Sequence, residues 1–223
     1  MKIISIIGSP HGEKGNTALL LNEVLKGSQH MGAQGETVFL KGGSVLPCLG
    51  CDKCHIKGRC LQKDEFETIK HKILEADGLI LASPNYIFSV SAQLKAFMDR
   101  CCGVIHCMAF EGKYGASIVT SGGGDEKPIV DYMNHFLITT GIHPVGSVWA
   151  TMGDLPEGVF TEEICRKAFN LGEILVLAWK RKKRFKSVDK KMTAFRNRMQ
   201  WLMEYRKEEW PYEYKYWQKY KGL

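Results

Sequence analysis

The sequence lacks any long apolar run. No stretch reaches the roughly 18 uninterrupted apolar residues that a membrane-spanning helix needs. The apolar run at residues 3–7 is also too short for a secretory signal, and no small-residue cleavage site follows it. We therefore expect a cytoplasmic protein without a membrane span. Thiols stay reduced in that compartment, so cysteines there more often bind metal or do redox chemistry than form disulfides.

Two common nucleotide-binding fingerprints are also missing. The chain has neither the P-loop pattern nor Gly-x-Gly-x-x-Gly, so neither ATP binding by a P-loop nor Rossmann-type NAD binding is indicated. Instead, a β-branched run at 2–8 leads into a polar loop with glycines at 9–17 and then a helical pattern at 18–32. Free N–H groups at such a helix start bind an anion such as phosphate, and Ser9, Asn16 and Thr17 would add side-chain donors.

Apolar strands alternate with helical patterns along most of the chain. This alternation predicts an α/β fold, a doubly wound five-stranded parallel sheet of order 2-1-3-4-5, with ligands bound outside the carboxyl ends of strands 1 and 3. Strands are expected at 2–8, 35–40, 77–83, 113–121 and 142–151. Helices are expected at 18–32, from residue 64, and at 92–105, 127–140 and 161–182.

Three loops of this predicted sheet meet at one crevice. The loop at 9–17 suits a phosphate, while Tyr86 and Phe88 after the third strand could stack against a flat ring. Gly122 to Gly124 after the fourth strand is bare backbone that can approach such a ring closely. A phosphorylated planar ligand, FMN, fits all three loops at once. The alternative is that the two aromatic residues are core residues at a strand end.

Four of the eight cysteines lie within thirteen residues, at Cys48, Cys51, Cys54 and Cys60. Four thiolates can bind a [4Fe-4S] cluster, and the ferredoxin run has the same two-residue gaps between its first three cysteines. The five-residue gap must then let Cys60 fold back, and Gly58 could supply the turn. Zinc, which usually takes two separated pairs, and a loop of metal-free thiols are the alternatives.

The remaining cysteines and histidines show no metal-ligand spacing. Cys101, Cys102, Cys107 and Cys165 are expected to be small buried apolar residues. His55 is expected to be an exposed loop residue without a role, or alternatively a substitute ligand. No zinc-ligand spacing is found among the remaining histidines, which are His30, His71, His106, His135 and His143.

The last 44 residues form a basic and aromatic tail. Residues 180–223 contain 15 Lys and Arg against 5 Asp and Glu, and ten of the aromatic residues. Basic residues at 180–184 complement a helix end, so nucleic-acid binding is not favoured. We expect a domain at 1–186 with a cysteine loop at 47–61, and a helical arm at 187–223. The arm is expected to pack on a neighbouring subunit of a homodimer or homotetramer.

Three segments resemble the FMN-binding segments of the NADPH-dependent FMN reductase group of flavodoxin-like proteins. They are Gly8-Ser9-Pro10 with Gly15-Asn16-Thr17, Ser83-Pro84-Asn85-Tyr86 with residues 95–100, and Thr120-Ser121-Gly122-Gly123-Gly124. The cysteine run is similar to the cluster motif of the iron-sulfur flavoprotein branch of this group. The resemblance covers about residues 1–150. His11 stands where the branch commonly has arginine, and a histidine carries charge only when protonated.

The resemblance implies an FMN-dependent oxidoreductase that passes electrons between a [4Fe-4S] cluster and FMN. Ferredoxin or NAD(P)H would be the electron donor, and a small oxidant or quinone-like molecule the acceptor. The flavin would carry the chemistry, so no catalytic side chain is expected. A reductase with idle cysteines and a flavodoxin-like electron carrier or regulator are the alternatives. The expected FMN contacts are Ser9, His11, Asn16, Thr17, Pro84, Asn85, Tyr86, Phe88, Ser121, Gly122, Gly123 and Gly124.

Overall fold

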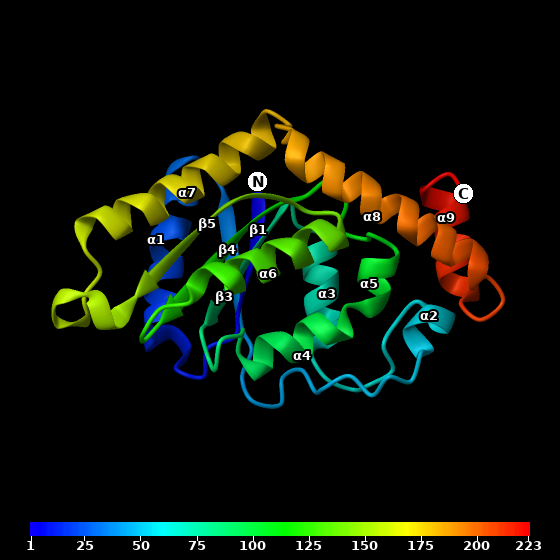
Figure 1. Cartoon of the computed structure of the whole chain (residues 1–223), viewed down its shortest axis with the longest axis horizontal. Helices are drawn as coiled ribbons and strands as arrows, with labels where there is room; N and C mark the ends of the chain where they lie inside the picture. Colours follow the sequence, from blue (N-terminus) through cyan, green and yellow to red (C-terminus); the bar gives the residue numbers. More distant parts are fainter.

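A computed structural model describes residues 1–223 as a parallel sheet with helices on both faces (Figure 1). The strand order is β2-β1-β3-β4-β5, and all neighbouring strands are parallel, which confirms the predicted α/β topology. The strands are β1 (Lys2–Ile7), β2 (Gln34–Phe39), β3 (Gly78–Pro84), β4 (Tyr114–Ser121) and β5 (His143–Thr151). Each lies within two residues of its predicted position.

The helices cover the two faces of the sheet and continue beyond it. None of them combines the length and the apolar character needed to span a membrane. They are α1 (Asn16–His30), α2 (Lys53–Lys57), α3 (Phe66–Leu74), α4 (Ala92–Arg100), α5 (Cys102–His106), α6 (Glu126–Thr140), α7 (Glu162–Lys180), α8 (Lys186–Tyr205) and α9 (Pro211–Tyr220). Short 3₁₀ turns are η1 (Gly12–Lys14), η2 (Met152–Asp154) and η3 (Pro156–Gly158).

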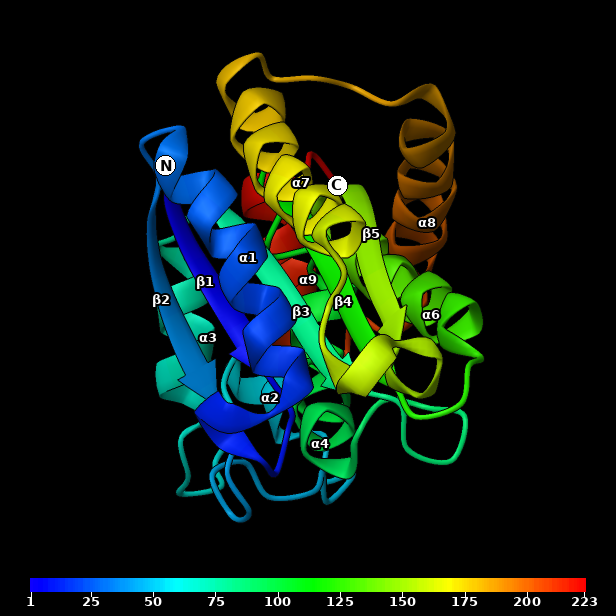
Figure 2. The same cartoon turned by 90° about the vertical axis from the view of Figure 1, so that its left-hand side faces the viewer.

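The central strands are buried on both faces, as their continuous apolar runs predict. Every residue of β3 and of β4 is buried, whereas β2 at the sheet edge has none that is fully buried. Helices α1 and α7 cover one face, and α3, α4 and α6 cover the other (Figure 2). Two apolar cores therefore sandwich the sheet.

Helices α1 and α7 approach each other closely because glycines face each other where they cross. A Cβ atom on Gly27 would lie 1.9 Å from the carbonyl oxygen of Phe169, and one on Gly172 would lie 2.0 Å from that of Val24. The Ser28 hydroxyl donates to the Gly172 carbonyl oxygen at 3.3 Å. This crossing fixes α1, whose first turn borders the crevice described below.

The helix predicted at 92–105 is two helices. Helix α4 ends at Arg100, the Cys101 N–H donates to the Met98 carbonyl oxygen, and α5 begins at Cys102. The predicted continuous helix was therefore wrong at this point. Because of this break, the short helix α5 has an axis of its own. Cys102 and His106 of α5 face the cysteine loop.

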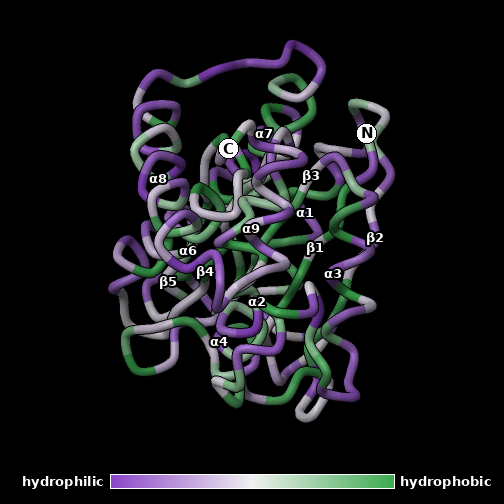
Figure 3. Tube along the Cα trace, turned by 90° about the vertical axis from the view of Figure 1, so that its right-hand side faces the viewer, coloured by the Kyte–Doolittle hydropathy of each residue, from purple (hydrophilic) through white to green (hydrophobic).

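The C-terminal arm contacts the body of its own chain. Helix α8 runs past α6, and α9 lies against α2 (Figure 3). Side chains of α9 also contact α5. Trp217 of α9 is buried, and its indole N–H donates to the His106 carbonyl oxygen at 3.0 Å. The cysteine loop and α5 form the surface that α9 covers, and packing of the arm on a neighbouring subunit stays a prediction.

Candidate functional site

The loop after β1 leads into a helix start that no side chain caps. Helix α1 begins at Asn16 after Gly15, with no side-chain hydrogen bond to its first turn. The Thr17 hydroxyl lies 2.7 Å from that of Thr120, so a buried hydrogen bond joins this turn to the end of β4. Free N–H groups with neighbouring hydroxyls are the donors that a phosphate needs.

The loop after β3 is a tight two-residue hairpin. Tyr86 and Ser89 exchange two backbone hydrogen bonds, of 3.0 and 3.3 Å. Ile87 and Phe88 between them have φ values of 49° and 61°, a backbone conformation that residues other than glycine rarely adopt. Both side chains point into solvent, Ile87 being 89% and Phe88 74% exposed. Strained backbone of this kind is often found at functional sites.

The glycine loop after β4 is held by a buried carboxylate. Glu126 accepts hydrogen bonds from the hydroxyls of Ser121 and Thr151, the latter at 2.6 Å. Ser121 in turn accepts the N–H of Gly124 at 2.8 Å. Burial raises the pKa of Glu126, but these hydrogen bonds outweigh burial and lower it, so the carboxylate is charged at neutral pH. Gly122 and Gly123 have open space beside them.

These three loops line one crevice at the carboxyl ends of β1, β3 and β4. Nine of the twelve predicted FMN contacts line it; Phe88, Gly123 and Gly124 do not. Thr120 and Met152 also line it and were missed, as was the supporting residue Glu126. The nine are Ser9, His11, Asn16, Thr17, Pro84, Asn85, Tyr86, Ser121 and Gly122.

Asn85 connects two of the loops and leaves one acceptor without a partner. Its backbone N–H donates to the Thr120 carbonyl oxygen at 2.7 Å, and its amide Nδ2 donates to that of Gly124 at 2.9 Å. The carbonyl oxygen Oδ1 is buried and has no donor. A buried acceptor without a donor is costly. A ligand with a ring N–H, such as a flavin, would satisfy it.

The cysteine loop leaves β2 at the same edge of the sheet. All four cysteines are free thiols: Cys48 and Cys51 are exposed, and Cys54 and Cys60 are partly buried. Cys54 and Cys60 line one cavity of about 120 Å³ between the loop, α3, α5 and α9. The loop turns through Gly58, whose φ is 72°, as the five-residue gap required. Together the four thiols are a donor set that suits an iron-sulfur cluster.

A buried ion pair connects both ends of this loop to α4. Arg100 forms two hydrogen bonds with Asp64, at 2.7 and 3.2 Å, and donates to the Leu46 carbonyl oxygen at 2.9 Å. Asp64 also accepts the N–H groups of Leu46 and Phe66. Leu46 precedes the cysteines and Asp64 follows them, so this pair sets the span that the loop must close.

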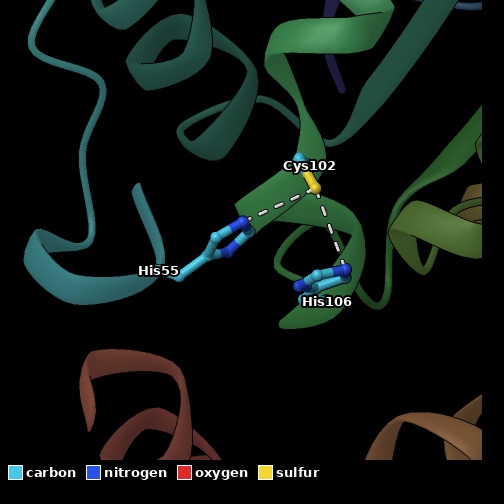
Figure 4. Close-up of side chains that lie close together, drawn as sticks. All are labelled: His55, Cys102 and His106. Atoms are coloured by element: carbon cyan, nitrogen blue, oxygen red, sulfur yellow. Dashed lines mark hydrogen bonds between the residues drawn. The ribbon is translucent and has the colours of Figure 1, made fainter. Parts of the chain in front are cut away.

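A second cluster of side chains lies behind the loop. His55 of α2 and His106 of α5 each direct an imidazole Nε2 at the Cys102 thiol, at 3.8 Å in both cases (Figure 4). Their Nδ1 atoms contact the two carboxylate oxygens of Glu213, at 2.6 and 3.0 Å. His55 is 4% exposed and Glu213 is fully buried. This cluster joins the cysteine loop to α5 and to the C-terminal helix.

The match to family models identifies the fold family. Residues 1–156 match the model of NADPH-dependent FMN reductase. The chain belongs to this family. The match covers all three crevice loops and the cysteine run, and so agrees with the resemblance drawn from the motifs.

Within this FMN reductase family, the chain groups with iron-sulfur flavoproteins. It is 37% identical to one from Archaeoglobus fulgidus over 190 residues, 85% of each chain. It is 32% identical to one from Methanosarcina thermophila, over 78% of this chain and 97% of that one. An NADH:FMN oxidoreductase structure in its apo form has a TM-score of 0.60 at 23% identity, covering 79% of this chain and 89% of that one, and shows the shared fold.

Membership in the FMN reductase family confirms the predicted flavin oxidoreductase and the predicted family branch. The predicted cofactors, FMN and an iron-sulfur cluster, agree with the family name and with the names of these relatives. The three FMN-binding segments and the cysteine run therefore pointed to the same family that the match over residues 1–156 identifies.

The second cluster overturns three expectations about this protein. His55 is buried rather than exposed, Cys102 faces two imidazoles rather than apolar neighbours, and His106 is part of a site. Cys101 and Cys107 are buried as expected, and Cys165 is only partly so. The signal in the sequence was Cys-x-x-x-His, which places Cys102 and His106 on one helix face.

Charges within this cluster stabilise one another. Burial raises the pKa of the Cys102 thiol, but the two imidazoles outweigh burial and lower it to about 6. Burial lowers the pKa of His106, but Cys102 and Glu213 outweigh burial and raise it to about 9. Burial also lowers the pKa of His55, but Cys102, Cys54 and Glu213 outweigh burial and raise it. A thiolate beside nitrogen donors is therefore available at neutral pH.

Proposed function

We propose that this protein is an oxidoreductase in which electrons pass between FMN in the crevice and a [4Fe-4S] cluster on the cysteine loop. The single observation that carries the proposal is that both sites open at the same edge of the sheet, because β2 and β1 are neighbours. NAD(P)H or ferredoxin would be the donor, and a small oxidant or quinone-like molecule the acceptor. FMN would supply an N5 atom that accepts and releases electron pairs.

The crevice residues would bind and orient this flavin. The first turn of α1 and the Ser9, Asn16 and Thr17 side chains would receive the phosphate. Oδ1 of Asn85, which has no donor, would accept a ring N–H. Tyr86, which is 42% exposed, would lie against the ring and leave one side open to small molecules.

The cluster would bind through Cys48, Cys51, Cys54 and Cys60. Cys54 and Cys60 already line a common cavity, and Arg100 beside Cys60 would offset part of the negative charge of the thiolates. The left-handed backbone of Asp52 and Gly58 lets the chain reverse twice between the cysteines. Reversals of this kind let four thiols approach one site.

A second candidate is an NAD(P)H-dependent FMN or quinone reductase without a working cluster. The observation that favours it is the exposure of Cys48 and Cys51, which do not line the cavity with the other two cysteines. The crevice would then act alone, and the cysteine loop would be structural.

Anaerobic purification with iron, sulfide and FMN analysis tests the proposal. We expect about four irons per chain and one FMN. Cys48→Ser should lose the iron and retain the FMN, because Cys48 lies outside the crevice. Cys165→Ser, on α7, is the matched control and should retain both.

Electron transfer is measured by mixing the loaded protein with NADPH or with reduced ferredoxin and following the absorbance of cluster and flavin. Bleaching of both in the wild type, and of the flavin alone in Cys48→Ser, would support the proposal. FMN-dependent quinone reduction at the same rate in an iron-free wild type would support the second candidate instead.

A further inference from the structure

The cluster of His55, Cys102 and His106 has the composition of a transition-metal site. The three ligand atoms lie within 4.8 Å of one another (Figure 4). They come from two helices: Cys102 and His106 are one turn apart on α5, and His55 reaches them from α2. A thiolate and two imidazoles are ligands that zinc prefers in proteins.

The distances match those of a metal site better than those of direct hydrogen bonds. Each imidazole Nε2 lies 3.8 Å from the Cys102 sulfur. A tetrahedral zinc with bonds of about 2.3 Å to sulfur and about 2.0–2.1 Å to nitrogen puts those two atoms about 3.6 Å apart. Both sulfur–nitrogen distances are therefore close to those that one shared ion requires, and the two imidazole ligand atoms lie within 4.8 Å of each other.

Glu213 orients both imidazoles for such an ion. Its Oε1 accepts from Nδ1 of His55 at 2.6 Å, and its Oε2 accepts from Nδ1 of His106 at 3.0 Å. An imidazole that donates Nδ1–H to a carboxylate presents the lone pair of Nε2, and histidine ligands of metals nearly always have such a partner. One fully buried carboxylate here serves two ligands.

Charge and enclosure are compatible with a divalent cation. A doubly charged ion that displaces the Nε2 protons of the two imidazoles replaces their charge, and so keeps the Cys102 thiolate and the Glu213 carboxylate balanced. The Trp210 indole stacks on His55 and His106, with ring centroids 4.6 and 4.8 Å apart, and shields the imidazoles from water. A charge-balanced group of ligands that is shielded from water is characteristic of a metal-binding site.

We infer that His55, Cys102 and His106 bind one zinc ion, with Glu213 orienting the two imidazoles and the fourth position left to water. The zinc ligands are different residues from the four cysteines of the run. The zinc site therefore does not depend on the electron transfer proposed for FMN and the iron-sulfur cluster. The zinc would join α2 to α5, and Glu213 would extend that connection to α9.

Metal analysis of the full-length protein, purified anaerobically with zinc chloride and iron supplied, tests the inference. We expect about one zinc per chain in addition to the iron. Cys102→Ser and His106→Gln should lose the zinc and retain iron and FMN. Cys48→Ser should lose the iron and retain the zinc, so the two metal centres are scored separately in the same samples.

Glu213→Gln tests the orienting carboxylate without removing a ligand. Zinc affinity, measured by competition with a chromophoric chelator, should fall about 10–100-fold. Glu209→Gln is the matched control, since its carboxylate is 60% exposed and pairs only with Arg206. Its zinc affinity should be that of the wild type.

Zinc X-ray absorption on the wild type gives an answer even if a variant fails to fold. One sulfur neighbour at about 2.3 Å with nitrogen or oxygen neighbours at about 2.0–2.1 Å is the expected shell. A shell of four sulfurs would assign the zinc to the cysteine run and overturn the inference. So would a wild type that binds no zinc, or a zinc content unchanged in both Cys102→Ser and His106→Gln.

Discussion

Asp64 and Arg100 form a two-bond ion pair that is almost completely buried, with 3% and 1% of the two side chains exposed. The pair joins the residue that follows the cysteine run to α4, and through the Leu46 carbonyl oxygen it also joins the residue that precedes the run. Within the run, the Cys60 N–H donates to Glu67 at 2.7 Å, and His55 contacts Glu213 at 2.6 Å. The distance between the two ends of the run is therefore fixed by Asp64 and Arg100, which lie outside the run and 36 residues apart.

Asp64→Asn should destabilise the protein strongly, because it leaves the Arg100 charge buried without a counterion. Breaking a buried pair in this way costs about 3–5 kcal/mol. Asp99→Asn breaks the exposed Lys95–Asp99 pair and is the matched control, with an expected cost below about 1 kcal/mol. Urea unfolding of both variants measures the difference. Equal losses of unfolding free energy in the two variants would show that the buried pair stabilises the protein no more than the exposed pair does.

The contribution of Asp64 should disappear in acid. Burial raises the pKa of Asp64, but Arg100 and two backbone N–H groups outweigh burial and lower it. A lowered folded-state pKa gives stability that is present above the unfolded value of about 3.9 and lost as the pH falls through the folded value. The difference in unfolding free energy between wild type and Asp64→Asn should therefore shrink below about pH 4. A difference that stays constant down to pH 3 would contradict this.

Gly58→Ala should reduce iron binding more than the same change at Gly50. Both glycines have left-handed φ values, 72° and 59°, so both variants pay a backbone strain of about 1–2 kcal/mol. Only the Cβ at position 58 also meets the Tyr212 ring, at 2.2 Å, while the one at position 50 meets nothing. Iron per chain after anaerobic reconstitution measures the effect.

A second substitution isolates the clash in Gly58→Ala. Adding Tyr212→Ala removes the ring and should restore part of the iron content. If Gly50→Ala and Gly58→Ala lose iron equally, the contact with α9 does not shape the loop.

Glu126→Gln should weaken FMN binding by about tenfold or more, because a hydrogen bond to a charged group is worth about 1.5–3 kcal/mol. The glycine loop would lose the charged acceptor that holds Ser121 and Thr151. Glu163→Gln, an exposed carboxylate on α7, is the control. Quenching of flavin fluorescence gives both affinities. An unchanged affinity would mean that Ser121 and Thr151 hold the loop without the charge.

The sheet order and the crevice could be predicted because their signals are local. A buried strand followed by a polar loop with glycines can be recognised within about 20 residues of sequence. The parallel arrangement of the strands then places the loops that follow them at one end of the sheet. The exposed Phe88 could not be placed, because a hairpin turn directs its side chain to solvent. Glu126 was missed because its role depends on Thr151, a residue 25 positions away.

The second cluster could not be predicted because its parts meet only through tertiary contacts. His55 is buried by α9, and its carboxylate partner lies 158 residues further along the chain. The helix break at Cys101 gives α5 a direction of its own, and Gly103, two residues further on, does not by itself predict that direction. An aromatic tail likewise indicates that apolar surface must be covered, without indicating which surface.

The distance along the chain between His55 and Glu213 also constrains how the protein matures. A ribosome releases the cysteine loop long before it makes α9, so during synthesis the loop has neither the Glu213 carboxylate nor the Trp210 ring beside it. We therefore expect iron and zinc to be loaded after translation ends, and a transcript truncated before residue 210 to yield a flavin-binding chain with an immature metal loop.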